Sequence, residues 1–188
     1  MKNKIKKYLN KLNNVLEEFD IDSLELVINR FLHARDNNNN IFVFGNGGSG
    51  STASHMVCDI LKGCSFNKEE KFKIFCLNDN IPTILAYSND VSYDVIFEEQ
   101  LKNYMSIGDV VLAISGSGNS KNIIKAIDYA NSNGATTIGF TGFDGGLLKK
   151  KSDVNLHVPI NDMQISEDLQ LIVSHMCMQC LNTRVIHI

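Results

Sequence analysis

The sequence predicts a doubly wound α/β fold, a three-layer α/β/α sandwich with a five-stranded parallel sheet, preceded by N-terminal helices. After residue 40, strand-like runs alternate with helical stretches, as in parallel α/β domains. The runs VVLAIS (110–115) and TTIGF (136–140) are apolar or β-branched throughout, as expected of strands that helices cover on both sides. Turns rich in Gly and Ser follow two of the strands. Ligands in such folds bind beyond the carboxyl ends of the strands, so these turns are the first place to look for a site.

Two helices are expected at the N-terminus. Apolar residues recur at spacings of three and four over residues 3–19, which is typical of an amphipathic helix. A second helix can be capped by Asp22 or Ser23 and run to about Arg35, where the segment DNNNN ends the pattern. Beyond it, the expected strands lie near 41–45, 72–77, 109–115, 136–141 and 154–158, and the expected helices near 49–62, 94–105, 120–132 and 164–183.

Composition bounds the possible functions. The chain has 188 residues, 18 basic and 21 acidic side chains, a net charge of -3 and no Lys/Arg cluster beside aromatic residues, so nucleic acid is not an expected partner. No apolar run approaches the ~20 residues of a membrane span, and no apolar region follows the basic N-terminus as in a secretory signal. The five cysteines are odd in number and lie mostly in apolar segments, which is typical of reduced thiols in a cytoplasmic protein. Cys177 and Cys180 form a lone C-x-x-C pair, which predicts core packing rather than a redox or zinc site.

The two Gly- and Ser-rich turns have the composition of anion-binding turns. The first, GNGGSGS, follows strand 41–45, and the second, SGSGNS, runs from Ser115 to Ser120 after strand 109–115. Glycines let the backbone approach an anion, hydroxyls donate to it, and the N-terminus of the following helix favours negative charge. A tight strand-to-helix connection would explain one such turn but explains two of them less well. We therefore expect both turns to bind a phosphate.

The first turn also fits the dinucleotide fingerprint G-x-G-x-x-G at Gly45, Gly47 and Gly50. A dinucleotide site needs only one such turn, plus an acidic residue about 20 positions on at the tip of the second strand. Here that strand ends in LNDN, which places Asp79 about 30 positions past Gly50. A P-loop is excluded because no Gly-Lys-Ser/Thr follows either turn. The turns therefore favour a smaller phosphorylated ligand.

Five segments carry a resemblance to a known family: GNGGSGSTASH, YSND, GDVVLAISGSGNSKNIIKAIDYA, GATTIGFTGFDGG and EDLQLIVSH. They resemble the sugar isomerase (SIS) domain family, and most closely its phosphoheptose isomerase branch, over roughly residues 40–180. The resemblance implies a flavodoxin-like SIS fold and a ketose–aldose isomerase. Its reaction would convert sedoheptulose 7-phosphate to D-glycero-D-manno-heptose 7-phosphate for surface-polysaccharide heptose synthesis.

Two alternatives stay open. The first is an isomerase of another phosphosugar, because Asp59, Gly116 and Glu167 depart from the pattern of the branch. The second is a non-catalytic SIS module that binds a phosphosugar or a protein; the loss of His55 and His175 would mark such a module, and both are present.

The resemblance also implies the substrate contacts. The phosphate would be held by Ser115, Gly116, Ser117 and Ser120. The sugar would be contacted by Asn46, Gly47, Gly48, Ser49, Asn89, Asp90 and Glu167. Asn89 and Asp90 match an Asn–Asp pair of the family that contacts substrate hydroxyls, although Asp90 could equally cap a turn before Tyr93.

The branch further uses an acid, a base and a zinc ion held by His, Glu, Gln and His. The matching positions here are His55, Asp59, Glu167 and His175, with Asp59 either the base or only a ligand, and His175 the second catalytic group. His55 and Asp59 stand four apart, so a helix places them on one face. Glu167 and His175 stand eight apart, ~12 Å along a helix, so one ion could meet both only midway or with help from a neighbouring subunit. The set suits one zinc ion per site, or another first-row metal.

The two N-terminal helices, residues 1–36, have apolar stripes that precede a complete α/β unit. We expect them to belong to the same domain as the SIS unit, residues 37–188, and to serve in oligomerisation. The resemblance implies a homotetramer with its sites at the subunit boundaries.

Overall fold

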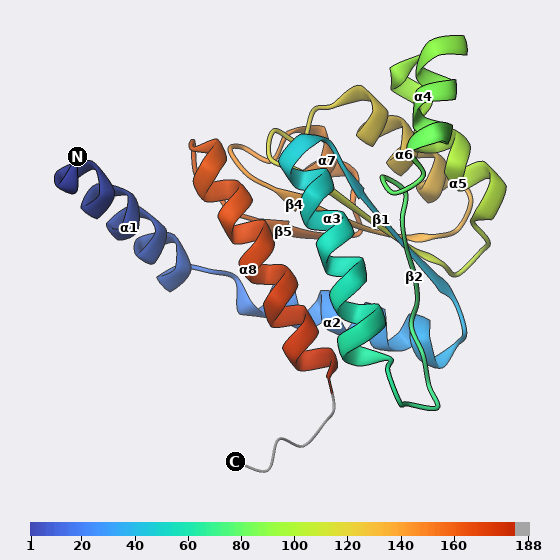
Figure 1. The fold of residues 1–188 in the computed structure, drawn as a ribbon, viewed down its shortest axis with the longest axis horizontal. Helices are drawn as coiled ribbons and strands as arrows, with labels where there is room; N and C mark the ends of the chain where they lie inside the picture. The colour runs from blue at the N-terminus through green and yellow to red at the C-terminus, as the bar shows by residue number, and fades with distance from the viewer. Residues whose placement is uncertain (183–188) are drawn as a thin grey trace.

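Five strands form one sheet in the order β2-β1-β3-β4-β5, and all neighbouring strands are parallel (Figure 1). The computed structural model describes residues 1–182. This arrangement confirms the predicted five-stranded parallel sheet, and the strand order is the flavodoxin-like one. The strands are β1 (Asn40–Gly45), β2 (Lys73–Cys76), β3 (Val110–Ser115), β4 (Thr136–Thr141) and β5 (Val154–His157).

Helices cover both faces of the sheet, because the side chains of each strand point alternately to either face. Ile41 and Val43 of β1 pack with α2, α3 and α8, whereas Phe42 and Phe44 pack with α5 and α6. All four side chains are buried. The helices are α1 (Lys2–Glu17), α2 (Ile21–Asp36), α3 (Gly47–Asp59), α4 (Ile81–Asp90), α5 (Glu98–Tyr104), α6 (Lys121–Ser132), α7 (Gly146–Lys151) and α8 (Met163–Leu181), with a π-helical turn at Ile60–Cys64 and a 3-10 turn at Tyr93–Val95.

α1 lies outside α8 and projects from the body of the molecule (Figure 1). Its Tyr8, Leu12 and Leu16 pack on a small apolar cluster at the start of α8, whereas Ile5 and Leu9 stay 55% and 51% exposed. No helix within residues 1–182 has both the length and the apolar character that crossing a membrane would take.

Four expectations about local structure are wrong. The second helix is capped by Asp20, whose Oδ1 accepts from Ser23 N at 3.0 Å, and not by Asp22 or Ser23. The helix expected at 94–105 is a 3-10 turn followed by the shorter α5, and α4 and α7 were not expected at all. Asp90 caps no turn: it ends α4, and the next turn is capped by Ser92 Oγ, which accepts from Asp94 N at 3.0 Å. Cys177 is buried as predicted, but Cys180 is exposed because it lies on the outer side of α8. The last residue of the helix expected at 164–183 lies outside the described residues.

Candidate functional site

The two anion-type turns leave the sheet side by side. β1 and β3 are parallel neighbours, with Gly45 opposite Ile114, and the strand order reverses between them. Ligands of open α/β sheets bind at this kind of switch point. A pocket of about 250 Å³ lies between the turns, and it includes every residue predicted to contact the substrate except Asn89 and Asp90. Its lining is Asn46, Gly47, Gly48, Ser49, Ile114, Ser115, Gly116, Ser117, Ser120, Met163 and Glu167.

Both turns deliver the N-terminus of a helix to this pocket. Gly47 has a φ of 55°, a conformation that glycine adopts readily, and it lets the chain turn directly from Asn46 into α3. The residues at the N-cap positions, Asn46 of α3 and Ser120 of α6, make no side-chain capping hydrogen bond. The first N–H groups of each helix have no intrahelical partner, so they remain available to an anion.

The side chain of Asn46 is held by two residues that the sequence did not predict. Asn46 and Asn122 exchange a pair of amide hydrogen bonds of 2.9 Å each, and Tyr93 Oη donates to Asn46 Oδ1 at 3.0 Å. Asn122 is the second residue of α6, two positions after the second turn, and this is the one local signal that could have identified it. These bonds orient Asn46 at the pocket and tie the first turn to α6.

The carboxylate of Glu167 lies against the first turn. A Cβ atom added to Gly48 would lie 2.6 Å from Glu167 Oε1, so the carboxylate occupies the space that a side chain at Gly48 would take. Next to this contact, Ser49 Oγ donates to Gln170 Oε1 at 2.9 Å. The start of α3 and the first turns of α8 are therefore fitted closely together at the pocket.

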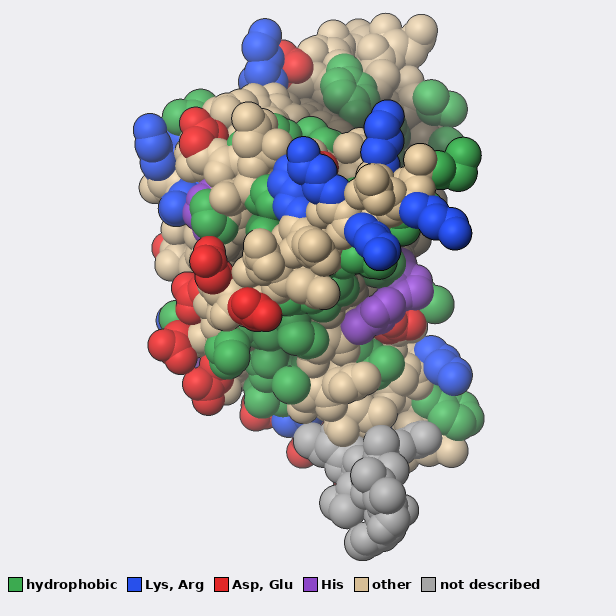
Figure 2. All heavy atoms as spheres, turned by 90° about the vertical axis from the view of Figure 1, so that its left-hand side faces the viewer, with side chains coloured by type: hydrophobic (Ala, Val, Ile, Leu, Met, Phe, Trp, Pro, Cys, Tyr) green, Lys and Arg blue, Asp and Glu red, His purple; other side chains and the backbone are tan. Residues whose placement is uncertain are grey.

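Two histidines and an aspartate converge farther along α3 and α8. His55 Nε2 lies 2.9 Å from His175 Nε2, and Asp59 Oδ2 lies 3.2 Å from the first nitrogen and 3.8 Å from the second. The side chains of His55 and His175 are 46% and 48% exposed, and that of Asp59 is 24% exposed. Figure 2 shows histidine side chains gathered at the surface beside an acidic one, with Lys and Arg side chains above them. The group is thus open to solvent.

The donor atoms of this group fit a divalent metal ion. One ligand atom from each of His55, Asp59 and His175 lies within 4.8 Å of the others. Ligands of a tetrahedral zinc ion at ~2.1 Å stand roughly 3.4 Å apart, which is close to the observed spacing. Two imidazole nitrogens that face each other at 2.9 Å are also well placed to share a cation. Three protein ligands would leave one coordination position open, as catalytic zinc sites require.

Glu167 is not brought to this group. Glu167 lies about two turns before His175 on α8, ~12 Å away along the helix, and its carboxylate faces Gly48. Its predicted place among the metal ligands therefore stays a prediction. Its predicted place at the substrate pocket agrees with where the carboxylate lies.

The SIS domain family matches residues 7–142, a region that contains both anion-type turns. The chain belongs to the SIS domain family. A probable phosphoheptose isomerase from Thermoplasma acidophilum is 37% identical over 91% of this chain and 93% of its own length. The phosphoheptose isomerase of Aliarcobacter butzleri is 34% identical over 80% of this chain and 79% of its own. The chain is therefore placed in the phosphoheptose isomerase branch.

The SIS fold is also shared with a solved structure. A phosphoheptose isomerase from Francisella tularensis superposes with a TM-score of 0.89, covering 97% of this chain and 98% of the other at 24% sequence identity. This likeness extends over α1 and α2 as well as the sheet, so the N-terminal helices are part of the shared fold.

In this SIS chain, Asn89 and Asp90 lie away from the pocket. They end α4, which stands off the sheet (Figure 1), and Asn89 Nδ2 donates to Asp90 Oδ1 at 2.7 Å on the exposed surface. Their contact with substrate hydroxyls stays a prediction.

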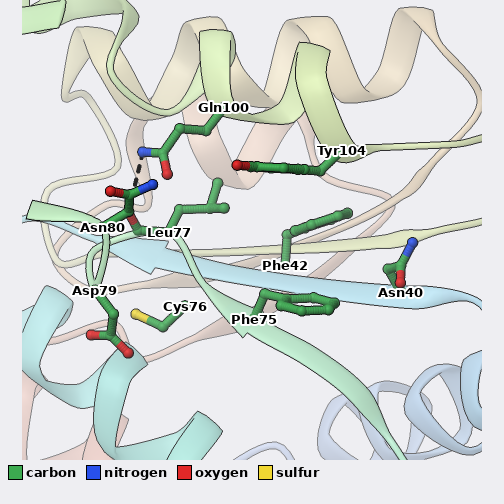
Figure 3. Close-up of a pocket in the computed structure, with 9 residues that line it drawn as sticks. All are labelled: Asn40, Phe42, Phe75, Cys76, Leu77, Asp79, Asn80, Gln100 and Tyr104. Carbon is green, nitrogen blue, oxygen red and sulfur yellow. Dashed lines mark hydrogen bonds between the residues drawn. The ribbon is translucent and has the colours of Figure 1, made fainter. Parts of the chain in front are cut away.

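A larger cavity, of about 600 Å³, opens at the outer edge of the SIS sheet, under α5 (Figure 3). The rings of Phe42, Phe75 and Tyr104 line its apolar side, and Gln100 closes one end by donating to the carbonyl of Leu77 at 3.2 Å. It contains neither anion-type turn nor any of the metal-type residues. Its size therefore does not make it the functional site.

Proposed function

We propose that this SIS protein is a ketose–aldose isomerase that converts sedoheptulose 7-phosphate to D-glycero-D-manno-heptose 7-phosphate for surface-polysaccharide heptose synthesis. One observation carries the choice of a long substrate. The pocket and the group of His55, Asp59 and His175 lie along the same pair of neighbouring helices, α3 and α8, and Glu167 stands ~12 Å from His175 along α8. A seven-carbon sugar can place its phosphate between the turns and its carbonyl end near the histidines. The names of the relatives support the same reaction.

The phosphate end is assigned to the two turns. Ser115, Ser117 and Ser120 line the pocket beside the uncapped N-termini of α3 and α6. Hydroxyl and N–H donors together satisfy several phosphate oxygens without requiring a basic side chain. Glu167 would accept hydrogen bonds from sugar hydroxyls next to the phosphate.

The isomerisation moves a proton between two adjacent carbons through an enediolate. We assign the proton transfer to Asp59. Its Oδ2 lies next to both imidazoles, which leaves Oδ1 as the atom that would take the proton. His175 would stabilise the developing oxyanion, by a hydrogen bond from its Nε2–H when no metal is bound and by holding the metal beside that oxygen when one is. The facing atoms of His55, Asp59 and His175 lie within 3.8 Å of one another, so a single substrate carbonyl can reach all three side chains.

We further propose that His55, Asp59 and His175 hold one zinc ion. When bound, the ion would polarise the substrate carbonyl and stabilise negative charge on its oxygen. The nitrogen and oxygen donors suit zinc, although the same donors accept other first-row metals.

We propose a cytoplasmic homotetramer with its sites at subunit boundaries. The histidine pair is almost half exposed, and an enediolate must be protected from water, so a neighbouring subunit would complete the enclosure. The exposed Ile5 and Leu9 of α1 offer apolar contact surface. Light scattering on the purified protein is expected to give the mass of four chains, and a monomer at micromolar concentration would contradict this proposal.

The reaction is tested by proton NMR on purified protein supplied with zinc and sedoheptulose 7-phosphate. We expect conversion to the aldose, with phosphorylated ketoses of five and six carbons turned over more slowly. Ser117→Ala is expected to raise KM chiefly, whereas His175→Ala is expected to abolish turnover. No conversion of the seven-carbon substrate would exclude it, and equal mild effects of the two substitutions would contradict the assigned roles.

A further inference from the structure

α8 carries a row of polar side chains on its buried face. Ser166, Gln170 and Ser174 follow one another at intervals of four residues, and they are 1%, 4% and 0% exposed. Burying a polar group costs free energy unless it is hydrogen-bonded, so each of these residues needs an explanation. Of the three, Gln170 is hydrogen-bonded to a residue that lines the substrate pocket, Ser49.

Gln170 connects α8 to the first turn of α3. Its Oε1 accepts from Ser49 Oγ at 2.9 Å, and Ser49 is itself only 5% exposed. Ser49 follows Gly48 in α3, and Glu167 precedes Gln170 by about one turn of α8. The buried Ser49–Gln170 bond therefore lies next to the Gly48–Glu167 contact that forms one wall of the pocket.

Stability alone does not account for a glutamine at this place. Within residues 1–182, the Nε2 atom of Gln170 and the Oγ atom of Ser166 have no hydrogen-bond partner in the protein, although both residues line the same small cavity against β4 and β5. A buried amide that makes only part of its hydrogen bonds stabilises a fold less than an apolar side chain of similar size. What the amide provides instead is a directional link between two helices.

We propose that Gln170 is a positioning residue for the start of α3, which forms one wall of the pocket. Through Ser49 it holds the N-terminus of α3 at a fixed distance from Glu167, and so it sets the width of the wall between Gly48 and the carboxylate. Because the hydroxyl of Ser49 is used in this bond, Ser49 offers the substrate its backbone N–H rather than its side chain. This inference rests on the proposed function, since it assigns a role at that same pocket.

The test compares Gln170→Leu with two other single variants. Gln170→Leu is expected to raise KM for sedoheptulose 7-phosphate about tenfold and to change kcat less than about threefold, because His175 lies about one and a half turns farther along α8. Its zinc content and Tm are expected to stay near the wild-type values. Ser49→Ala removes the same bond from the other side, so it should reproduce the effect, and the double variant should be no worse than either single one. Ser174→Ala, in the same buried row but away from the pocket, is the matched control and should leave KM unchanged.

A KM of Gln170→Leu equal to the wild-type value would overturn the inference. A lower Tm with an unchanged KM would overturn it too, because it would show that Gln170 serves only to pack α8. If Gln170→Leu fails to fold, KM of Ser49→Ala decides in its place. If the wild-type protein does not convert the sugar, the proposed function fails first, and the inference is then read from binding of inorganic phosphate by calorimetry. Weaker phosphate binding in Gln170→Leu than in Ser174→Ala supports it, and equal affinities overturn it.

Discussion

Gly48 is the position where one methyl group would alter the pocket most directly. Its backbone φ is not positive, so alanine is conformationally permitted, but the new Cβ would lie 2.6 to 2.8 Å from three atoms of the Glu167 carboxyl group. The carboxylate must move, and displacements of about this size weaken substrate positioning strongly. Gly48→Ala is therefore expected to raise KM about tenfold in the NMR assay.

Gly63→Ala is the matched control for this substitution. It lies in the π-helical turn that continues α3, where the nearest atom to an added Cβ is the Met178 sulfur at 3.3 Å, at the end of a flexible side chain. KM of Gly63→Ala should stay at the wild-type value. Equal effects of the two alanines would show that the substitutions act on α3 as a whole and not on the Glu167 contact.

The residues of the site divide into those with a local signal and those without. The turn residues could be predicted because glycine and serine at strand ends have a direct physical purpose. Tyr93 and Gln170 could not, because their partners are 47 and 121 residues away in the chain and an amide or phenol alone indicates no particular partner. Asn122, whose partner is 76 residues away, had only its place close to the second turn as a local signal. Glu167 was predicted as both a metal ligand and a substrate contact, and the packing of α8 on α3 favours the second role.

At the scale of elements, burial separates what could be predicted from what could not. The strands were predictable because β1, β3 and β4 are buried along almost their whole length and are apolar on both faces. α4 has no buried residue and α7 has six residues, so neither produces the apolar periodicity that identifies a helix. Exposed apolar side chains on α4, such as Ile81 and Leu85 at 62% each, instead suit a surface that meets another chain.

α1 is tied to α8 by a hydrogen bond that titrates. Tyr8 Oη donates to Asp168 Oδ2 at 2.5 Å, and this bond raises the pKa of Tyr8 from 10.0 to about 12. Below pH 10 the phenol is protonated in both the folded and the unfolded chain, so the bond contributes fully to stability. Between pH 10 and 12 the unfolded chain loses this proton first, so the contribution declines. Tyr8→Phe is therefore expected to lower the free energy of unfolding at pH 8 and to lower it less at pH 11.5, as measured by urea denaturation.

Tyr104→Phe serves as the control for this pH dependence. Tyr104 is 57% exposed on α5, so its substitution should change the free energy of unfolding little at either pH. A difference between Tyr8→Phe and the wild type that stays constant from pH 8 to pH 11.5 would contradict the assigned bond.

At the scale of the whole molecule, function depends on two parallel helices that the sequence separates by more than a hundred residues. α3 and α8 both begin at the carboxyl edge of the sheet and run side by side (Figure 1), so each supplies one residue near the phosphate end and one histidine farther along. The sequence indicated these residues and the ~12 Å between Glu167 and His175 along a helix, but not that this distance separates the two ends of one site beside α3. That separation follows from the helical rise of α8 and its packing on α3.

A metal ion held by His55, Asp59 and His175 would join these two helices, so its binding should stabilise the whole fold. An ion that binds only the folded chain adds about 2.7 kcal/mol when its concentration is a hundred times Kd. For a chain of this size, that corresponds to a rise in Tm of roughly 5–10 °C. We expect this difference between zinc-loaded and chelator-treated protein in differential scanning calorimetry. His175→Ala should lose most of it, whereas His33→Ala, an exposed histidine of α2, should keep it. The same rise in Tm in His175→Ala as in the wild type would place the metal elsewhere, and no rise in the wild type would exclude a metal at this group.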